Sequence, residues 1–271
     1  MKKSFYVMLS WASIIVLFFS SCSKTEIPGT SPTAGYTKIT EGYATGAAAK
    51  VEVYTTAPVI YTGYTNLYIA LYDSVSGSRI ENANIQLTPL MDMGSMQHSS
   101  PFENPASAQA VNHLFPCSVV FLMPSAAGNW SVSVSVWVNG KWGSFSFPVT
   151  VTDPVKSTLK SFTALNNGTK YFVALINPMQ PHVGINDMEI AIYKKESMMS
   201  YPAENGFTVL MEPEMPAMGH GSPNNVNPVA IGNGHYKGKV NFTMTGLWQV
   251  NLDFMMGADL ADDTQFFEIE F

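Results

Sequence analysis

The 271-residue chain contains few charged residues, since only 13% are Asp, Glu, Lys or Arg. Its 14 Lys and Arg are outnumbered by 20 Asp and Glu, which gives a net charge of −6. Binding to nucleic acid requires clustered basic side chains that neutralise phosphates, and no such cluster is present in the sequence. Nucleic acid is therefore excluded as a predicted partner.

Cysteine is almost absent, with Cys22 and Cys117 as the only two. Cys22 belongs to the N-terminal leader segment, so Cys117 has no partner cysteine and a disulfide framework is excluded. Cys117 follows His113 by four residues, but it alternates with Val119 and Phe121. That alternation predicts a buried thiol rather than a metal ligand.

Paired carboxylates at a recognisable spacing are missing, and so is a Ser, His and Asp nucleophile signature. The chain is therefore interpreted as a binding protein and not as an enzyme.

The longest apolar stretch, residues 5–19, is too short to span a bilayer comfortably. It follows two lysines and leads into Ser-Ser-Cys at residues 20–22, which is typical of a secretory signal. It resembles a bacterial lipoprotein signal, which implies cleavage after residue 21, a lipid on Cys22 and attachment to the outer membrane, facing the periplasm or the cell surface. A plain signal peptide and an uncleaved anchor are the alternatives.

Residues 22–47 are rich in Thr, Gly, Pro, Ser and Ala and have little apolar periodicity, which predicts a flexible tether. The remaining residues, about 225, suit two domains of roughly 100–120 residues each. Asp153 and Pro154 follow the end of one alternating segment and precede the next. We therefore predict domains at residues 48–153 and 154–271.

Short segments in both halves alternate apolar side chains with polar or small ones, between turns rich in Gly, Pro and Asn. No amphipathic helix longer than two turns is evident. The clearest segments are Leu67–Tyr72, Trp130–Val138, Phe145–Val151, Asp187–Tyr193, Val240–Met244, Trp248–Phe254 and Gln265–Phe271. The pattern predicts an all-β protein of two tandem β-sandwich domains.

A motif of methionines and a histidine occurs once in each half. MDMGSMQHSSP covers residues 91–101, and MEPEMPAMGHGSP covers residues 211–223. Both contain Met-x-x-Met-x-His, and a further histidine follows each motif histidine by fifteen residues. Each second histidine precedes a strand, a methionine (123 or 244), a turn and a tryptophan (130 or 248). The chain is thus predicted to be a tandem repeat.

The repeated donors predict a metal site in each domain. Thioether sulfur is soft and uncharged and imidazole accepts many metals, so the combination favours Cu(I) over zinc, calcium or magnesium. The predicted ligands are Met93, Met96, His98 and His113 in the first repeat, and Met215, Met218, His220 and His235 in the second. The alternative interpretation is structural, with the methionines plugging the open end of each sandwich.

Other methionines are weaker candidates. Met123 and Met244 lie on alternating strands, where a core position is the alternative to a role as ligand. Met91 and Met211 stand at unequal distances from the two motifs, so neither is assigned to a site.

LMEPEMPAMGHGSP followed by GHYKGKVNFTMTGLWQVNL resembles the YtkA-like domain family over residues 185–256. Residues 67–138 resemble it more loosely, because the proline after Met93 and the Gly-His-Tyr arrangement are missing. The resemblance implies small immunoglobulin-like sandwiches of the cell envelope, similar to periplasmic copper-binding proteins that use methionine and histidine.

Together these features predict a lipid-anchored envelope protein that binds copper in two immunoglobulin-like domains. It would buffer the copper or exchange it with a donor or acceptor protein of the envelope. The alternative is an interaction module of tandem sandwiches that binds a protein or a glycan without metal. Aromatic residues at positions 61, 64, 137 and 142 would supply its binding face.

Overall fold

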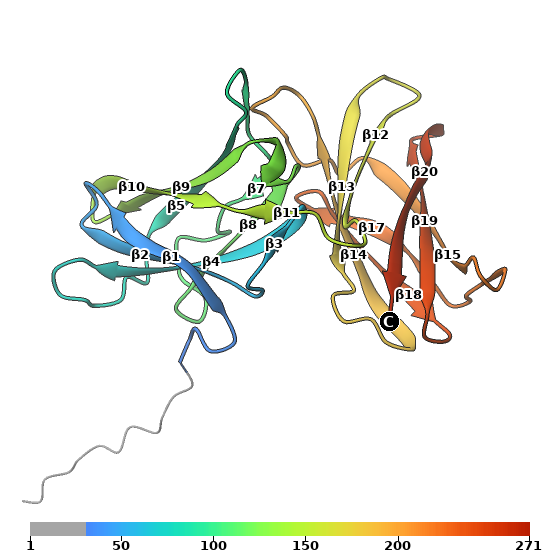
Figure 1. The fold of residues 1–271 in the computed structure, drawn as a ribbon, viewed down its shortest axis with the longest axis horizontal. Coiled ribbons are helices and arrows are strands. Elements are labelled where there is room, and N and C mark those ends of the chain that lie inside the picture. Colours follow the sequence, from blue (N-terminus) through green and yellow to red (C-terminus); the bar gives the residue numbers. More distant parts are fainter. Residues whose placement is uncertain (1–30) are drawn as a thin grey trace, which may run out of the picture. The chain divides into compact units, whose positions relative to one another are not determined.

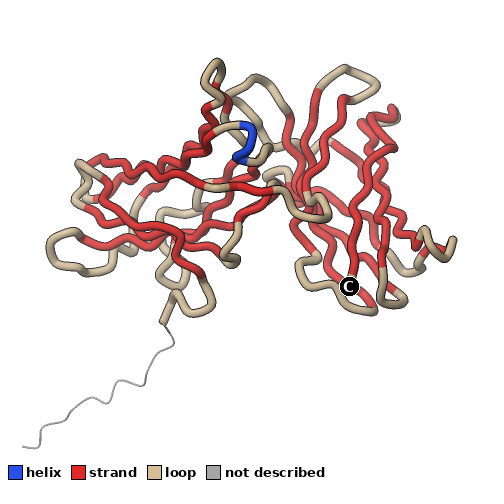
Figure 2. Tube along the Cα trace, in the orientation of Figure 1, coloured by secondary structure: helices blue, strands red, loops and turns tan. Residues whose placement is uncertain are grey.

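The computed structural model describes residues 31–271, which form strands joined by loops and a single short 3-10 helix at Ser125–Ala127 (Figures 1 and 2). The predicted signal at residues 1–21 and the predicted lipidation site, Cys22, lie outside the described residues. Within residues 31–271 there is no helix whose length and hydropathy would let it cross a membrane.

The first sandwich consists of a five-stranded and a four-stranded antiparallel sheet. The five-stranded sheet has the order β1 (Thr37–Ala44), β2 (Ala49–Thr55), β4 (Gly63–Asp73), β8 (Phe115–Phe121) and β7 (Phe102–Glu103). The four-stranded sheet has the order β10 (Lys141–Val149), β9 (Asn129–Val138), β5 (Asn84–Asp92) and β6 (Gln97–His98). Two short strands, β3 (Ile60–Tyr61) and β11 (Val151–Thr152), pair in parallel beside them.

The second sandwich is built in the same way. Its five-stranded sheet has the order β12 (Leu159–Thr163), β13 (Lys170–Asn177), β14 (Gly184–Lys194), β18 (His235–Phe242) and β17 (Val226–Gly232). Its four-stranded sheet has the order β16 (His220–Gly221), β15 (Phe207–Met215), β19 (Leu247–Met256) and β20 (Asp259–Glu270).

The two sandwiches repeat one topology, so the all-β fold predicted from the sequence is confirmed. Strand for strand, β4, β8, β5, β6 and β9 correspond to β14, β18, β15, β16 and β19. Both the motif hairpins and the strands that follow the second histidines therefore occupy matching places in the two halves.

Each sandwich has its own core, made by the inward side chains of its alternating strands. Strand β9 shows the pattern most clearly, because Trp130, Val132, Val134 and Val136 are at most 1% exposed while the serines between them are half-buried. A smaller apolar cluster joins the two sandwiches through Val120, Ala174, Ala191 and Tyr193. Residues 153–158, which include the predicted boundary, connect β11 to β12.

The prediction of a flexible tether over residues 22–47 is wrong for its last part. Residues 37–44 form strand β1, which pairs along its length with β2. This edge strand is held mainly by backbone hydrogen bonds to β2, so it does not need the apolar alternation that sequence analysis relies on. The ring of Phe145 also packs over Gly42, where an added Cβ would lie 2.1 Å from the ring. The folded part of the chain therefore begins about one strand earlier than residue 48.

Candidate functional site

Each Met/His motif forms a short hairpin at one end of its sandwich. In the first, β5 pairs with β6 so that Met91 lies opposite His98. In the second, β15 pairs with β16 so that Met215 lies opposite His220. Residues directly opposite each other in an antiparallel pair have Cβ atoms about 4.5–5.5 Å apart on the same face. Each hairpin thus places one thioether beside one imidazole.

The structure revises the predicted alignment of the methionines. The common spacing predicts Met93 as the counterpart of Met215, but the residue that lies opposite the histidine in the first sandwich is Met91. Met91 is 0% exposed and Met215 is 5% exposed, whereas Met93 is half-buried in the loop beyond the strand. The signal that relates the two buried methionines is a proline two residues earlier, Pro89 or Pro213.

Both motif histidines have one ring nitrogen fixed by the backbone. Nδ1 of His98 lies 2.7 Å from the carbonyl oxygen of Ser99, and Nδ1 of His220 lies 3.0 Å from that of Gly221. A carbonyl oxygen only accepts hydrogen bonds, so Nδ1 carries a hydrogen in each ring, and in the neutral ring Nε2 then has the free lone pair. Histidines that bind metals are commonly oriented in this way by a second hydrogen bond.

The free nitrogen of His98 is buried. His98 is 3% exposed, and its Nε2 has no hydrogen-bond partner among residues 31–271. A buried polar atom without a partner is uncommon in proteins, and a bound water or ion is one way in which such an atom is satisfied. Copper bound at Nε2 would satisfy this atom.

A buried tryptophan packs edge-on against each motif histidine. The ring centroids of His98 and Trp130 are 5.3 Å apart, and those of His220 and Trp248 are 5.9 Å apart. The indole N–H groups donate to the backbone carbonyls of Met123 and Met244, at 2.8 Å and 3.0 Å. These bonds fix the indole rings, which in turn limit how each imidazole can turn.

The loops of the two hairpins carry further thioethers. Met96 is 50% exposed and Met218 is 59% exposed, so neither fills a core. The loops are ordered by backbone bonds, from Met93 N–H to the Met96 carbonyl and from Met218 N–H to the Met215 carbonyl, both 3.0 Å. Each sandwich end therefore offers a buried thioether, an imidazole and an exposed thioether, which is a soft donor set that suits Cu(I).

The structure does not bring His113 or His235 to these ends. His235 begins β18, whose last residue, Phe242, packs its ring against Trp248 with the centroids 5.5 Å apart. Phe242 is seven positions along the strand from His235, which is about 23 Å at 3.3 Å per residue. His113 likewise precedes β8, at the opposite end from Phe121, which touches Trp130. The equal fifteen-residue spacing reflects the repeated topology and not a shared site.

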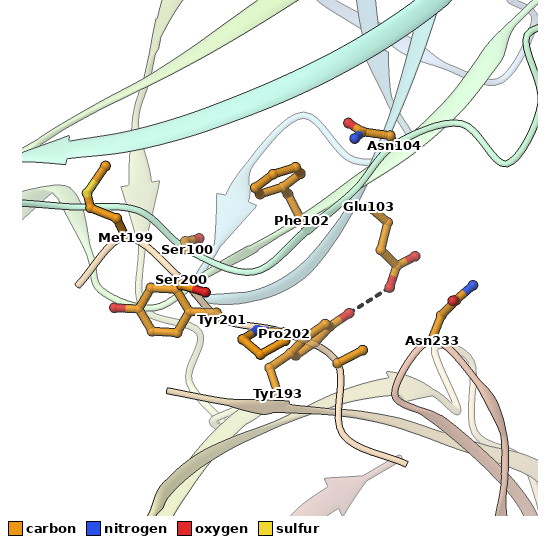
Figure 3. Close-up of a pocket in the computed structure, with 11 residues that line it drawn as sticks. Ser100, Phe102, Glu103, Asn104, Tyr193, Met199, Ser200, Tyr201, Pro202 and Asn233 are labelled. Atoms are coloured by element: carbon orange, nitrogen blue, oxygen red, sulfur yellow. Dashed lines mark hydrogen bonds between the residues drawn. The ribbon is translucent and has the colours of Figure 1, made fainter. Parts of the chain in front are cut away.

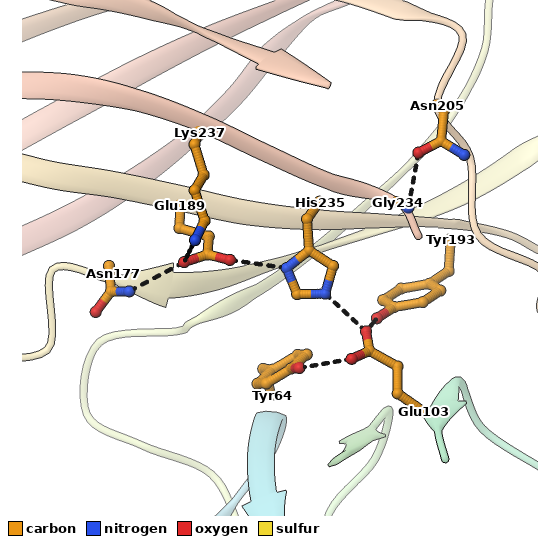
Figure 4. A network of polar contacts seen from close by, with 9 residues as sticks. All are labelled: Tyr64, Glu103, Asn177, Glu189, Tyr193, Asn205, Gly234, His235 and Lys237. Atoms are coloured by element: carbon orange, nitrogen blue, oxygen red, sulfur yellow. Dashed lines mark hydrogen bonds and ion pairs between the residues drawn. The ribbon is translucent and has the colours of Figure 1, made fainter. Parts of the chain in front are cut away.

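His235 instead joins the two sandwiches (Figure 4). Its Nε2 lies 2.8 Å from Oε1 of Glu103 in the first sandwich, and its Nδ1 lies 2.8 Å from Oε1 of Glu189. Glu103 also accepts hydrogen bonds from the hydroxyls of Tyr64 at 2.9 Å and Tyr193 at 2.6 Å. Ionised carboxylates only accept, so when both carboxylates are ionised both ring nitrogens donate, which is the imidazolium form of His235.

The electrostatics of this group agree with its hydrogen bonds. The contact with Glu103 is the main cause that raises the pKa of His235, against the opposing effect of burial, and the bond to Glu189 adds to it. Burial disfavours the ionised form of Glu103, but the hydrogen bonds from His235 and Tyr193 outweigh it and lower the pKa of this carboxyl. Burial chiefly raises the pKa of Tyr193, so this hydroxyl remains a donor.

His113 makes a simpler contact. It is exposed in a turn at a positive φ of 67°, and its Nδ1 lies 2.7 Å from Oε1 of Glu81. No group of three or more His, Cys, Asp or Glu side chains that could hold a metal occurs in the described part of the chain. Cys117 is buried, and burial raises the pKa of its thiol, as a core position requires.

A cavity of about 460 Å³ lies beside the contact between Glu103 and Tyr193 (Figure 3). Its walls come from both sandwiches, with Ser100 and Phe102 on one side and Met199 and residues 200–203 on the other. Its lining residues from the first sandwich follow the motif hairpin closely in the sequence, beginning at Ser100.

Comparison with known proteins identifies one family. Residues 166–253, which span most of the second sandwich, match the YtkA-like family, as the sequence predicts. No curated protein matches the chain. A solved structure, "Structure of the S-layer protein SbsC, domains 5-6", aligns with 12% sequence identity and a TM-score of 0.29, over 87% of this chain and 97% of that one.

Proposed function

We propose that this chain, whose residues 166–253 match the YtkA-like family, binds Cu(I) at the hairpin end of each sandwich and acts as a copper carrier or buffer of the cell envelope. The observation that carries the proposal is shared by both repeats: a histidine with Nδ1 tied to the backbone stands opposite a buried methionine. The proposed ligands are Met91, Met96 and His98 in the first sandwich, and Met215, Met218 and His220 in the second.

The chemistry of the donors favours Cu(I) over other metals. Thioethers bind soft ions of low charge, and they neither lose a proton nor form disulfides outside the cytoplasm. Exposed Met96 and Met218 would receive the ion first, and the buried partner and the imidazole would then hold it. No reaction is required for such a role.

Attachment to a membrane is part of the proposal. A lipid on Cys22 would tether the folded residues to the envelope, where a copper donor or acceptor protein could reach the hairpin ends. This part rests on the sequence of residues 1–22 alone.

Copper titration of the chain without residues 1–22 tests the function. Anaerobic addition of Cu(I) in competition with a chelator should give close to two ions per chain. The variant Met218→Leu/His220→Gln should bind close to one, while the control His113→Gln, which lies away from both hairpins, should bind two. Uptake of no Cu(I) by the unaltered chain rules out the function.

An interaction module remains the second candidate, for one specific reason. Trp142 is 55% exposed and its ring is tilted against that of Trp137 on the neighbouring strand, with the ring centroids 5.1 Å apart. Such a pair can pack against a sugar ring or an apolar side chain of a partner. Tyr64, by contrast, is engaged with Glu103 and is not available for such a surface.

A further inference from the structure

The two motif hairpins differ in one respect that their shared topology does not explain. After the motif histidine of the first sandwich, Ser99 is 4% exposed and Ser100 is 1% exposed, and His98 itself is 3% exposed. In the second sandwich the corresponding His220 is half-buried and Gly221 is exposed. Part of the cover comes from the first sandwich itself, because the hydroxyls of Ser99 and Ser100 donate to the carbonyls of Pro89 and Val120 at 2.8 Å and 2.6 Å. A further contact comes from the second sandwich.

That further contact is made by the loop that follows β14 in the second sandwich. The amide of Ser99 donates a 2.8 Å hydrogen bond to the backbone carbonyl of Met198. The next residue, Met199, lines the same cavity as Ser100 (Figure 3). The turn that carries these two consecutive methionines therefore contacts the residue next to His98, whose buried Nε2 lacks a partner among residues 31–271.

This loop is held in place by its own hydrogen bonds. The amide of Lys194 donates to the carbonyl of Pro202 at 2.9 Å, and the amide of Glu196 donates to that of Ser200 at 3.1 Å. The hydroxyl of Ser200 donates to the carboxylate of Glu196 at 3.0 Å, and the amide of Met199 donates to the hydroxyl of Ser197 at 3.1 Å. The turn that carries Met198 and Met199 is thus a fixed feature beside the first hairpin.

The two methionines do not serve the core. Met198 is 36% exposed and Met199 is 54% exposed, and neither packs in the core of the second sandwich. A methionine in a surface turn gains little from the hydrophobic effect, whereas its thioether is free to bind a soft metal. Among residues 31–271, the hydrogen bonds that involve Ser222, which follows His220 and Gly221, all stay within the second sandwich.

We propose that the first copper site is shared between the two sandwiches, with the Met198–Met199 turn adding thioether donors to a Cu(I) ion bound at His98. This inference rests on the proposed function. It makes the two sites unequal: the second is open and formed by one sandwich, whereas the first is covered and needs both. Copper at the first site would then hold the loop of the second sandwich against β6.

The test compares variants of the chain without residues 1–22, in a Met218→Leu/His220→Gln background that leaves only the first site. Adding Met198→Leu/Met199→Leu should weaken Cu(I) binding at least tenfold. Leucine nearly conserves the volume of methionine, and the bond from Ser99 uses the backbone of residue 198, so the fold should be retained. The control Met179→Leu changes a methionine that is 75% exposed elsewhere on the second sandwich and should leave binding unchanged.

A second comparison separates this inference from the proposed function. Combining Met198→Leu/Met199→Leu with His98→Gln should weaken the first site no more than His98→Gln alone, because all three residues would serve one ion. If the unaltered chain binds two Cu(I) but the double leucine variant binds them with the same affinities, the shared site is wrong and the proposed function stands. If the unaltered chain binds none, the function itself fails.

Discussion

Nε2 of His235 lies 2.8 Å from Oε1 of Glu103, and this contact connects β18 of the second sandwich to β7 of the first. The other ring nitrogen contacts Glu189, and Lys237 lies 3.3 Å from the second oxygen of that carboxylate. The imidazolium is therefore held between two carboxylates at the place where the sandwiches meet. A residue predicted to be a copper ligand acts instead as a charged link between domains.

Substituting Glu103→Gln should weaken this link. The amide keeps the size of the side chain but removes the charge that the imidazolium and both tyrosine hydroxyls contact. We expect a loss of about 1–3 kcal/mol in the free energy of unfolding, measured by chemical denaturation. The control Glu81→Gln removes an exposed partner of His113 and should cost less than about 1 kcal/mol. Equal effects of the two substitutions would contradict the role of Glu103.

The stability of the chain should depend on pH in a defined direction. The folded-state pKa of His235 is raised, so its contribution is complete below the ordinary pKa of 6.5 and is lost as pH rises through the higher folded value. The pKa of Glu103 is lowered, so its contribution is complete above 4.5 and is lost as pH falls through the lower folded value. In thermal unfolding measured across pH, the His235→Gln variant should not show the loss of stability that the unaltered chain shows as pH rises. Tyr64, Tyr193, Glu189 and Lys237 face the same group and stay in the variant.

The regular parts of the fold could be predicted from the sequence, whereas the exact site could not. Alternation along β9 and β19 is strong because one face of each strand is buried, so period two identifies both. The Met-x-x-Met-x-His spacing, however, relates the methionines of the two motifs only by their distance in sequence from the histidines. In the first hairpin a pair, Asp92 with Gln97, lies between the Met–His pair and the turn, whereas in the second the Met–His pair is the last one before the turn, and this shifts the buried methionine by two residues. Strand pairing of this kind depends on loop length and is not visible in spacing alone.

Contacts between the domains were also beyond sequence analysis. Glu103 and His235 are 132 residues apart, and neither residue type nor spacing indicates that they meet. The same holds for Met198, whose contact with Ser99 depends on how the sandwiches pack. The alternation that predicts strands describes each sandwich by itself and contains no information about that packing.

Two substitutions test which methionine serves the first site. Met91 is fully buried opposite His98, so Met91→Leu should be tolerated with a loss below about 1.5 kcal/mol while Cu(I) binding at this site falls at least tenfold. Met93→Leu, in the loop beyond the strand, should change Cu(I) affinity less. Titration of both variants in the Met218→Leu/His220→Gln background gives the comparison. A larger effect of Met93→Leu would restore the alignment based on spacing.

Gly246 supports the second site by leaving room for its buried methionine. Its φ is 128°, and a Cβ added there would lie 2.8 Å from Cε of Met215. Gly246→Ala should therefore destabilise the chain by more than about 1 kcal/mol and weaken copper binding at the second site only. The control Gly257→Ala also has a positive φ, of 63°, but its added Cβ meets nothing within 4 Å. It should show the backbone cost alone, with both copper sites intact.

Mild oxidation should separate a copper site from an interaction surface. Peroxide converts exposed methionines to sulfoxides first, so Met96 and Met218 should react before the fully buried Met91. A sulfoxide is a harder, oxygen-bearing group, and Cu(I) binding at both hairpins should fall while thermal unfolding changes little. Methionine sulfoxide reductases should restore binding, with mass spectrometry reporting the state of each residue. Full copper uptake by chains oxidised at both positions would mean that these thioethers are not ligands, and a surface built on Trp137 and Trp142 would then be the better account of the sandwiches.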